Sequence, residues 1–236
     1  MRIMAIIPAR KDSKGVINKN KRLVCGKELF KYTFDLAEKC DFFDKVVLTT
    51  NDQEIIEAAA NYKIDVPYKR EEELAGDSVK TIDVVLDVLK YYAQENYFPD
   101  AVMLLQITAP MRSVDDVKRV VEMFNKSNAD SIVSVEKVDE PHPYKMKSIN
   151  EDGEIKPFIE GTNSEIPRQL LPEVYKLNGC IYLTKTQILR DCSNFFGEKS
   201  ISYIMKKTIN IDCEMDLKIL ELVLSDKINL DRKGTF

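Results

Sequence analysis

Short apolar runs alternate with amphipathic helical patterns along most of this chain, and that alternation limits the folds open to it. Residues 3–7 and 101–105 are apolar throughout and have the length of strands that are buried on both faces. Between them, residues 81–93 repeat apolar side chains at the spacing of one helix face. This order predicts an α/β fold, with a mostly parallel sheet covered by helices on both faces.

The same patterns predict the remaining regular elements. Asp52 precedes one helical pattern as an N-cap, and Ser113 with Asp116 has the form of a capping box before another. The expected helices cover residues 29–38, 52–60, 81–93, 113–126 and 214–224, and the expected strands cover residues 3–7, 45–49, 64–68, 101–105, 131–135, 179–184, 202–205 and 208–211.

Residues 138–176 interrupt this alternation. The segment is rich in proline, carries the turn signal Asn150-Glu151-Asp152-Gly153 and lacks helical spacing. We therefore expect a single domain over residues 1–236, with an insertion of irregular chain and short antiparallel strands at about residues 138–176.

The composition is that of an ordinary globular protein and excludes several functional classes. A formal net charge of −4 argues against a general binder of nucleic acid or of membrane surfaces. No apolar run approaches the roughly 20 residues that span a bilayer, and no signal-peptide pattern is present, so we expect a cytoplasmic protein. Five scattered cysteines and a single histidine argue against a disulfide framework, a zinc site and a multi-histidine metal site.

A basic loop follows the first predicted strand. Residues 10–19 contain four cationic side chains at the carboxyl end of that strand, where open α/β sheets bind ligands. The loop has one glycine, Gly15, and therefore matches neither G-x-x-x-x-G-K-[ST] nor G-x-G-x-x-G. Phosphates would be held by charged side chains as much as by backbone amides, unless the loop is simply solvated.

Four further polar clusters follow predicted strands or lie in the insertion. Each has an ordinary structural explanation: Gln106 and Thr108 as loop hydrogen-bonding groups, Arg168 as a solvated residue, Tyr182 as core, and Asp212 as part of a helix's first turn. Their occurrence together in one chain favours a shared site. The clusters are residues 70–78, 105–112, 167–182 and 210–216.

These segments resemble one known family. The motifs IIPARKDSKGVINKN, REEELAGDSVKT, LLQITAPMRS, PRQLLPEVYKLNGCIYLT and INIDCEMDL occur in family order over residues 3–217. They resemble the acylneuraminate cytidylyltransferases, which include the CMP-sialic acid synthetases and relatives that act on other nonulosonic acids. The resemblance implies a Rossmann-like three-layer sandwich of the nucleotide-diphospho-sugar transferase type. The close alternative, the 3-deoxy-manno-octulosonate cytidylyltransferases, generally lacks the PRQ…NG-x-IY stretch.

The family resemblance implies transfer of CMP from CTP to the anomeric hydroxyl of a nine-carbon 2-keto-3-deoxy sugar acid, with Mg²⁺ and release of pyrophosphate. Cationic side chains suit this reaction because they neutralise a triphosphate and stabilise charge on the leaving pyrophosphate. By resemblance, CTP is contacted by Ala9, Arg10, Lys14, Asn20, Arg70, Thr81 and Gln106, and the catalytic residues are Arg10, Lys14, Lys19 and Asp212.

The resemblance also implies a pocket for the sugar acid. Arg168 is suited to bind the substrate carboxylate through two hydrogen bonds. In the family the insertion crosses to the other subunit of a homodimer, so some of these groups would act in the partner's site. The implied sugar contacts are Gln106, Arg168, Asn178, Tyr182, Phe195 and Phe196.

One position departs from the family pattern. The family usually has Asp-x-Asp after the last strand, and this chain reads Asn210-Ile211-Asp212. Magnesium prefers oxygen ligands, so Asp212 with the amide oxygen of Asn210 is the expected metal site, with one negative charge fewer. Weaker metal binding, a single metal or another metal preference would follow. The alternative to an enzyme is a non-catalytic protein of the same fold that binds a nucleotide or a sugar.

Overall fold

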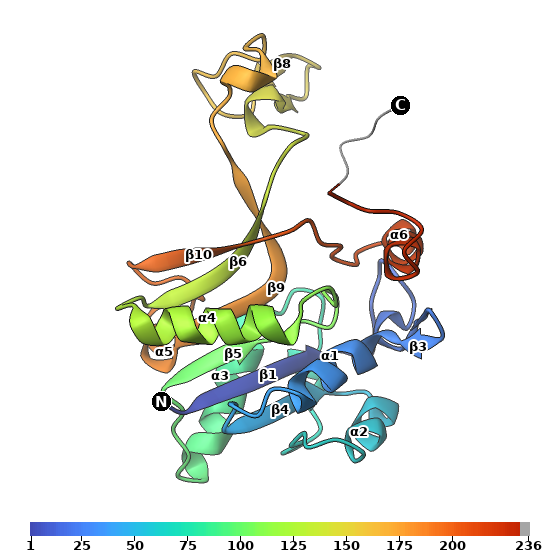
Figure 1. Cartoon of the computed structure of the whole chain (residues 1–236), viewed down its shortest axis with the longest axis vertical. Helices are drawn as coiled ribbons and strands as arrows, with labels where there is room; N and C mark the ends of the chain where they lie inside the picture. The colour runs from blue at the N-terminus through green and yellow to red at the C-terminus, as the bar shows by residue number, and fades with distance from the viewer. Residues whose placement is uncertain (232–236) are drawn as a thin grey trace.

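The computed structural model describes residues 1–231 and confirms the predicted α/β fold. A six-stranded sheet has the order β10-β6-β9-β5-β1-β4, in which β9 alone runs antiparallel to its neighbours (Figure 1). The sheet strands are β1 (Ile3–Ala9), β4 (Lys45–Thr50), β5 (Ala101–Leu104), β6 (Ser131–Lys137), β9 (Tyr175–Lys185) and β10 (Ser200–Met205).

Helices cover both faces of this sheet, as expected. Alternate side chains of β1 enter two separate cores, with Ala5 and Ile7 in one and Met4 and Ile6 in the other. The first core includes apolar residues of α1, α2, α4 and α6, and the second includes residues of α3 and α5. The helices are α1 (Leu29–Glu38), α2 (Gln53–Ala59), α3 (Thr81–Gln94), α4 (Val114–Lys126), α5 (Thr186–Cys192) and α6 (Glu214–Leu224).

The predicted helix caps are confirmed. The Asp52 side chain accepts a hydrogen bond from the Glu54 amide at the start of α2. Ser113 and Asp116 form both bonds of a capping box at the start of α4. These local bonds satisfy backbone donors that have no partner inside the helix.

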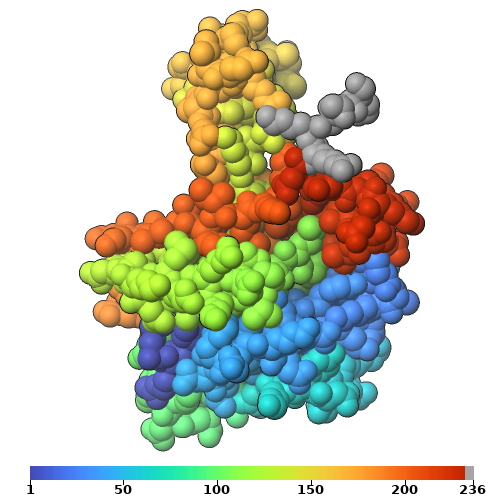
Figure 2. Space-filling model, viewed as in Figure 1, coloured from blue at the N-terminus to red at the C-terminus, as the bar shows by residue number. Residues whose placement is uncertain are grey.

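The insertion is an arm that projects from the sheet (Figures 1 and 2). We use "the arm" for residues 138–174, which join the ends of β6 and β9. It contains two antiparallel strands and two short 3-10 helices, together with exposed apolar side chains such as Ile149 and Phe158. The small elements of the chain are β2 (Leu23–Val24), β3 (Lys27–Glu28), β7 (Lys147–Ile149), β8 (Ile155–Pro157), η1 (Lys19–Lys21), η2 (Glu72–Leu74), η3 (Pro143–Lys145) and η4 (Arg168–Leu170).

Two expected strands are wrong. Residues 64–68 make only one isolated bridge beside β4, between Asp65 and Val47, because Pro67 lacks the amide hydrogen that a continuous ladder needs. Residues 208–211 form a loop whose amides bond elsewhere: Thr208 to the Glu136 carboxylate and Ile211 to the Thr108 carbonyl. In residues 1–231 no helix has the length and apolar character needed to cross a membrane.

Candidate active site

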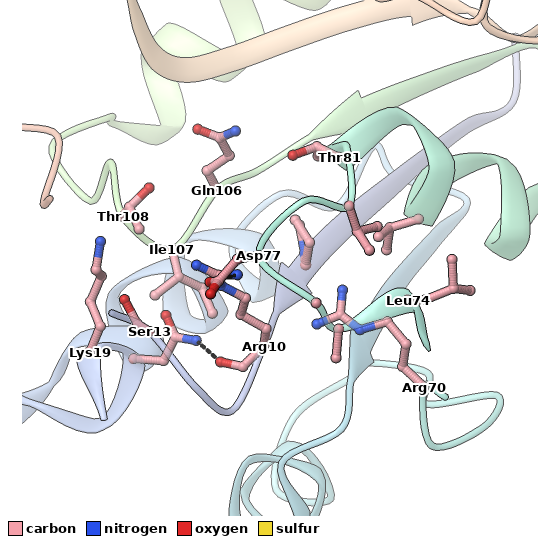
Figure 3. A pocket seen from close by; sticks show the side chains of 16 residues that line it. Arg10, Ser13, Lys19, Arg70, Leu74, Asp77, Thr81, Gln106, Ile107 and Thr108 are labelled. Atoms are coloured by element: carbon pink, nitrogen blue, oxygen red, sulfur yellow. Dashed lines mark hydrogen bonds and ion pairs between the residues drawn. The ribbon is translucent and has the colours of Figure 1, made fainter. Parts of the chain in front are cut away.

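A cavity of about 300 Å³ lies at the carboxyl ends of β1 and β5, where three of the predicted motifs meet (Figure 3). Ala9 is buried at the end of β1, and the Lys14 side chain is largely exposed beside the cavity. The other residues predicted to contact the nucleotide all line it. With the predicted catalytic Lys19, these lining residues are Arg10, Lys19, Asn20, Arg70, Thr81 and Gln106.

Arg70 is the most informative residue in this cavity. Its side chain is only 4% exposed, and its Nε and Nη2 atoms have no hydrogen-bond partner. Burial lowers the pKa of Arg70. An unsatisfied buried donor costs about 1–3 kcal/mol, and more when it is charged. Because Arg70 also lines the cavity, its unsatisfied guanidinium makes it a candidate ligand-binding residue.

The basic loop makes hydrogen bonds within itself and polar contacts with residues 211–212 near the C-terminal helix. Asn20 Nδ2 donates to the Arg10 carbonyl at 2.9 Å. Lys19 Nζ donates to the Ile211 carbonyl at 2.6 Å and lies 3.6 Å from a carboxylate oxygen of Asp212. The loop therefore brings Lys19 to the Asn210–Asp212 segment.

Asp77 holds two of the predicted phosphate-binding cations together. Its carboxylate lies 2.6 Å from Arg10 Nη1 and 2.8 Å from Lys14 Nζ. Hydrogen bonds from Lys14 and Arg10 hold the pKa of Asp77 below its usual value. Sequence reasoning missed this residue although it lies within a quoted motif, because nothing local indicates that the segment folds back over the loop.

Gln106 lies in a turn that a buried arginine supports. Arg112 Nη1 donates to the carbonyls of Gln106 and Ala109 at 2.8 and 2.6 Å, and Arg112 Nη2 donates to Thr33 Oγ1 at 2.9 Å. Burial lowers the pKa of Arg112 to about 10. Arg112 was not predicted as a site residue; it is bonded to protein groups and shapes the turn that presents Gln106 to the cavity.

Two glycines allow close approaches between the motifs. A Cβ atom on Gly179, whose φ is +75°, would lie 2.9 Å from Gln106 Oε1. A Cβ atom on Gly15 would lie 2.1 Å from the Asp212 carbonyl oxygen. The single glycine of the basic loop therefore serves to pack that loop against the backbone of Asp212.

The Asn210–Asp212 segment offers one open carboxylate. Asp216 accepts from the backbone amides of Asp212 and Cys213, and Glu214 forms a two-bond pair with Arg22. The Asp212 side chain is 78% exposed. Among residues 1–231, no group of three or more His, Cys, Asp or Glu side chains is arranged to hold a metal ion. A cation here would need oxygen ligands from a substrate, which is how Mg²⁺ is usually bound.

The residues predicted for the sugar acid other than Gln106 are not gathered in the cavity. The Tyr182 ring packs against Phe195 and Phe196, with centroid distances of 5.5 and 6.5 Å. Asn178 is buried in β9, where its Oδ1 accepts from Ser134 Oγ at 2.6 Å and from the Cys180 amide. Its amide oxygen therefore serves the irregular pairing of β6 with β9, and a contact with a sugar stays a prediction.

Arg168 lies on the arm, outside the set of residues that line the cavity. Its guanidinium is half exposed and faces Asp139 at 3.3 Å and Glu140 at 3.9 Å. Arg168, the residue predicted to bind the substrate carboxylate, therefore does not contribute to the cavity of its own subunit.

The chain is similar to several known proteins. A family model described as cytidylyltransferase matches residues 4–151. The CMP-N,N'-diacetyllegionaminic acid synthase of Legionella pneumophila is 33% identical over 95% of this chain and 97% of that protein. The N-acylneuraminate cytidylyltransferase of Escherichia coli is 31% identical over 97% of this chain and 53% of that protein.

One solved structure shows the same fold. A CMP:2-keto-3-deoxy-manno-octonic acid synthetase, complexed with CTP, aligns with a TM-score of 0.69 over 97% of this chain and 100% of that chain, at 15% identity. At that identity the likeness concerns the fold alone. The family match covers more than half of the chain, and the sequence similarity extends over nearly all of it. This chain therefore belongs to the cytidylyltransferase family.

Proposed function

We propose that this protein transfers CMP from CTP to the anomeric hydroxyl of a nonulosonic acid and releases pyrophosphate. Similar proteins are named as synthases of CMP-activated legionaminic, acylneuraminic and pseudaminic acids, which supports this class of substrate. The observation that carries the proposal is the buried Arg70 guanidinium with two unpartnered donors, in a cavity also lined by Arg10 and Lys19.

In this reaction the substrate hydroxyl oxygen forms a bond to the α-phosphorus of CTP and loses its proton to water, and the bond from that phosphorus to the pyrophosphate oxygen breaks. Arg10, Lys14 and Lys19 would stabilise the charge that develops on the leaving pyrophosphate. Asn20, Arg70 and Thr81 would hold the nucleoside, since they match family positions that contact it and all three line the cavity.

We further propose that magnesium binds beside the basic loop. Asp212 is the expected carboxylate ligand, and Asn210 would add a neutral amide oxygen. The open Asp212 carboxylate fits such an ion, whereas Asp216 and Glu214 are bonded to backbone amides and to Arg22. When bound, the ion would neutralise charge on the phosphates.

We propose that the arm pairs with a second copy of the chain. Exposed apolar side chains at Ile149, Ile155, Phe158 and Leu170 support this, because an arm of this size otherwise leaves them in water. Pairing would let Arg168 serve the partner's site, which agrees with its absence from the cavity in its own subunit.

The function is tested by measuring pyrophosphate release with CTP, Mg²⁺ and a panel of acceptors. The panel contains sialic, legionaminic and pseudaminic acids, with 3-deoxy-manno-octulosonate as the eight-carbon comparison. We expect turnover with at least one nine-carbon acid and weaker turnover with the eight-carbon acid. CTP binding without turnover on any acceptor would instead support a non-catalytic binder, for which the loss of an acidic residue at Asn210 is the motivation.

Replacing Asp77 with asparagine should tighten phosphate binding. The Asp77 carboxylate pairs with Arg10 and Lys14, so a triphosphate competes with it for both cations. We expect the Kd for inorganic tripolyphosphate to fall about threefold to tenfold, measured by calorimetry. Glu73→Gln changes the charge equally on the same segment and is the matched control. An equal gain in both variants would show a general charge effect, and weaker binding in Asp77→Asn would show that Asp77 positions the cations.

Replacing Arg168 with alanine should impair binding of the sugar acid. We expect its KM to rise about tenfold or more, with the KM for CTP within about twofold, because a carboxylate would lose two charge-assisted bonds. A similar rise in both KM values would contradict the proposed role. If Arg168 serves the partner's site, mixed and re-associated Arg168→Ala and Arg70→Met chains should regain roughly a quarter of wild-type activity, because half of the dimers then contain one intact site.

A further inference from the structure

Asn51 connects two parts of the candidate site without touching the cavity. It follows β4 directly, its side chain is 4% exposed, and it is not among the residues that line the cavity. It lies in none of the motifs that indicated the site in the sequence. Its two amide atoms nevertheless bond to the basic loop and to the segment that begins with Arg70.

The two bonds run in opposite directions. Asn51 Oδ1 accepts from the backbone amide of Lys11 at 2.8 Å. Asn51 Nδ2 donates to the Glu72 carboxylate, with distances of 3.0 and 3.2 Å to its two oxygens. An amide side chain provides an acceptor and a donor on one rigid group, whereas an aspartate of the same shape provides acceptors only.

The residues held in this way are next to the cations of the cavity. Lys11 follows Arg10 in the chain, and Glu72 is two residues beyond Arg70. The neighbouring Thr50 carbonyl accepts from the Arg70 amide at 2.8 Å, which fixes the start of the second segment at the same strand end. The carboxyl end of β4 is thus the common support of both segments.

We propose that Asn51 is a positioning residue that sets the separation between Arg10 and Arg70, and thereby the affinity for CTP. This inference rests on the proposed function, because it takes CTP as the ligand of the cavity. Asn51 acts through the Lys11 amide and Glu72, and it makes no contact with the reacting atoms.

The test is a pair of substitutions that exchange donor and acceptor. Asn51→Asp keeps the acceptor for the Lys11 amide but places a carboxylate against Glu72, so the two segments should separate. We expect the KM and the Kd for CTP to rise about tenfold, with kcat and the KM for the sugar acid changed by less than about threefold. Adding Glu72→Gln restores a donor toward residue 51, so the double variant should return to within about threefold of wild type.

The control separates a specific bond from net charge. Glu71→Gln removes the same charge from the adjacent exposed residue, whose side chain is not among the partners of Asn51. Asn51→Asp combined with Glu71→Gln should therefore keep the weak CTP binding. Equal rescue by Glu71→Gln and Glu72→Gln, or unchanged CTP affinity in Asn51→Asp, would overturn the inference.

Two further outcomes are informative. If Asn51→Asp does not fold, the double variant with Glu72→Gln must fold and bind CTP near the wild-type level, and a folded double variant that binds CTP weakly would reject the proposal. Calorimetry of CTP binding to the wild-type protein distinguishes failure of the proposed function from failure of the inference about Asn51 alone. Wild-type protein that fails to bind CTP rejects the proposed function and this inference together, whereas normal wild-type binding with unaffected Asn51→Asp rejects only the inference.

Discussion

Replacing Arg70 with methionine should reduce kcat/KM for CTP by about 100-fold or more, while the protein becomes no less stable. The guanidinium is buried beside the cavity with two unpartnered donors, so it is unfavourable for the unliganded fold. A methionine of similar length removes that buried charge and keeps the apolar packing of the side-chain stem. Activity and stability are therefore expected to change in opposite directions.

Pyrophosphate release and thermal unfolding measure these two effects on the same preparations. Lys69→Met is the matched control, because it removes the same charge from the exposed neighbouring residue. Arg70→Lys should give an intermediate loss, since an ammonium group keeps the charge without the planar set of donors. A large loss of stability in Arg70→Met, or full activity, would contradict a role for Arg70 in binding ligand.

Replacing Asp212 with asparagine should lower kcat by about 100-fold or more. Asp212 carries the open carboxylate of the Asn210–Asp212 segment, and its loss would leave only neutral oxygens there. The reverse substitution, Asn210→Asp, should lower the Mg²⁺ concentration needed for half-maximal activity, because it restores the charge that the family usually has. Rates of pyrophosphate release over a range of Mg²⁺ concentrations measure both effects.

Glu214→Gln is the control for this experiment, because the Glu214 carboxylate is paired with Arg22 at the start of α6. It should change the dependence on Mg²⁺ little. Asp212 also lies beside Lys19, so its role could be to pair with that lysine rather than to bind the metal, and the two roles predict different results. If Asp212 serves only that lysine, Asp212→Asn would tighten binding of tripolyphosphate and leave kcat unchanged.

Patterns of near neighbours in the chain account for what could be predicted. Apolar periodicity located five of the six α-helices in residues 1–231 and most strands of the sheet, but it missed the short helix α5. The caps at Asp52 and Ser113 join side chains to backbone amides two or three residues away. The two strands that were wrong, at residues 64–68 and 208–211, have β-like composition but lack continuous partners. A strand forms only beside a hydrogen-bonding partner strand, and local composition does not specify that partner.

The residues of the candidate site also fall into a group that the sequence predicted and a group that it missed. The motifs located Arg10 and Gln106, since these follow β1 and β5 and the carboxyl ends of parallel strands meet at one edge. Arg70 reaches the same edge although no strand precedes it, because its amide bonds to the Thr50 carbonyl at the end of β4. Asp77 and Asn51 were missed, because their roles depend on contacts with segments 63 to 67 residues and 21 to 40 residues away, respectively.

The sequence alone therefore determined the alternation of strands and helices, the cationic character of the first loop and the reduced charge at Asn210. Only the tertiary structure decided which polar groups are already satisfied. Asp77 pairs with Arg10 and Lys14, Asp216 is bonded at the start of α6, and Arg70 keeps unpartnered donors. The physical reason is that hydrogen bonds and ion pairs form between atoms that are close in space, and their distances are set by packing of the whole sheet rather than by spacing along the chain.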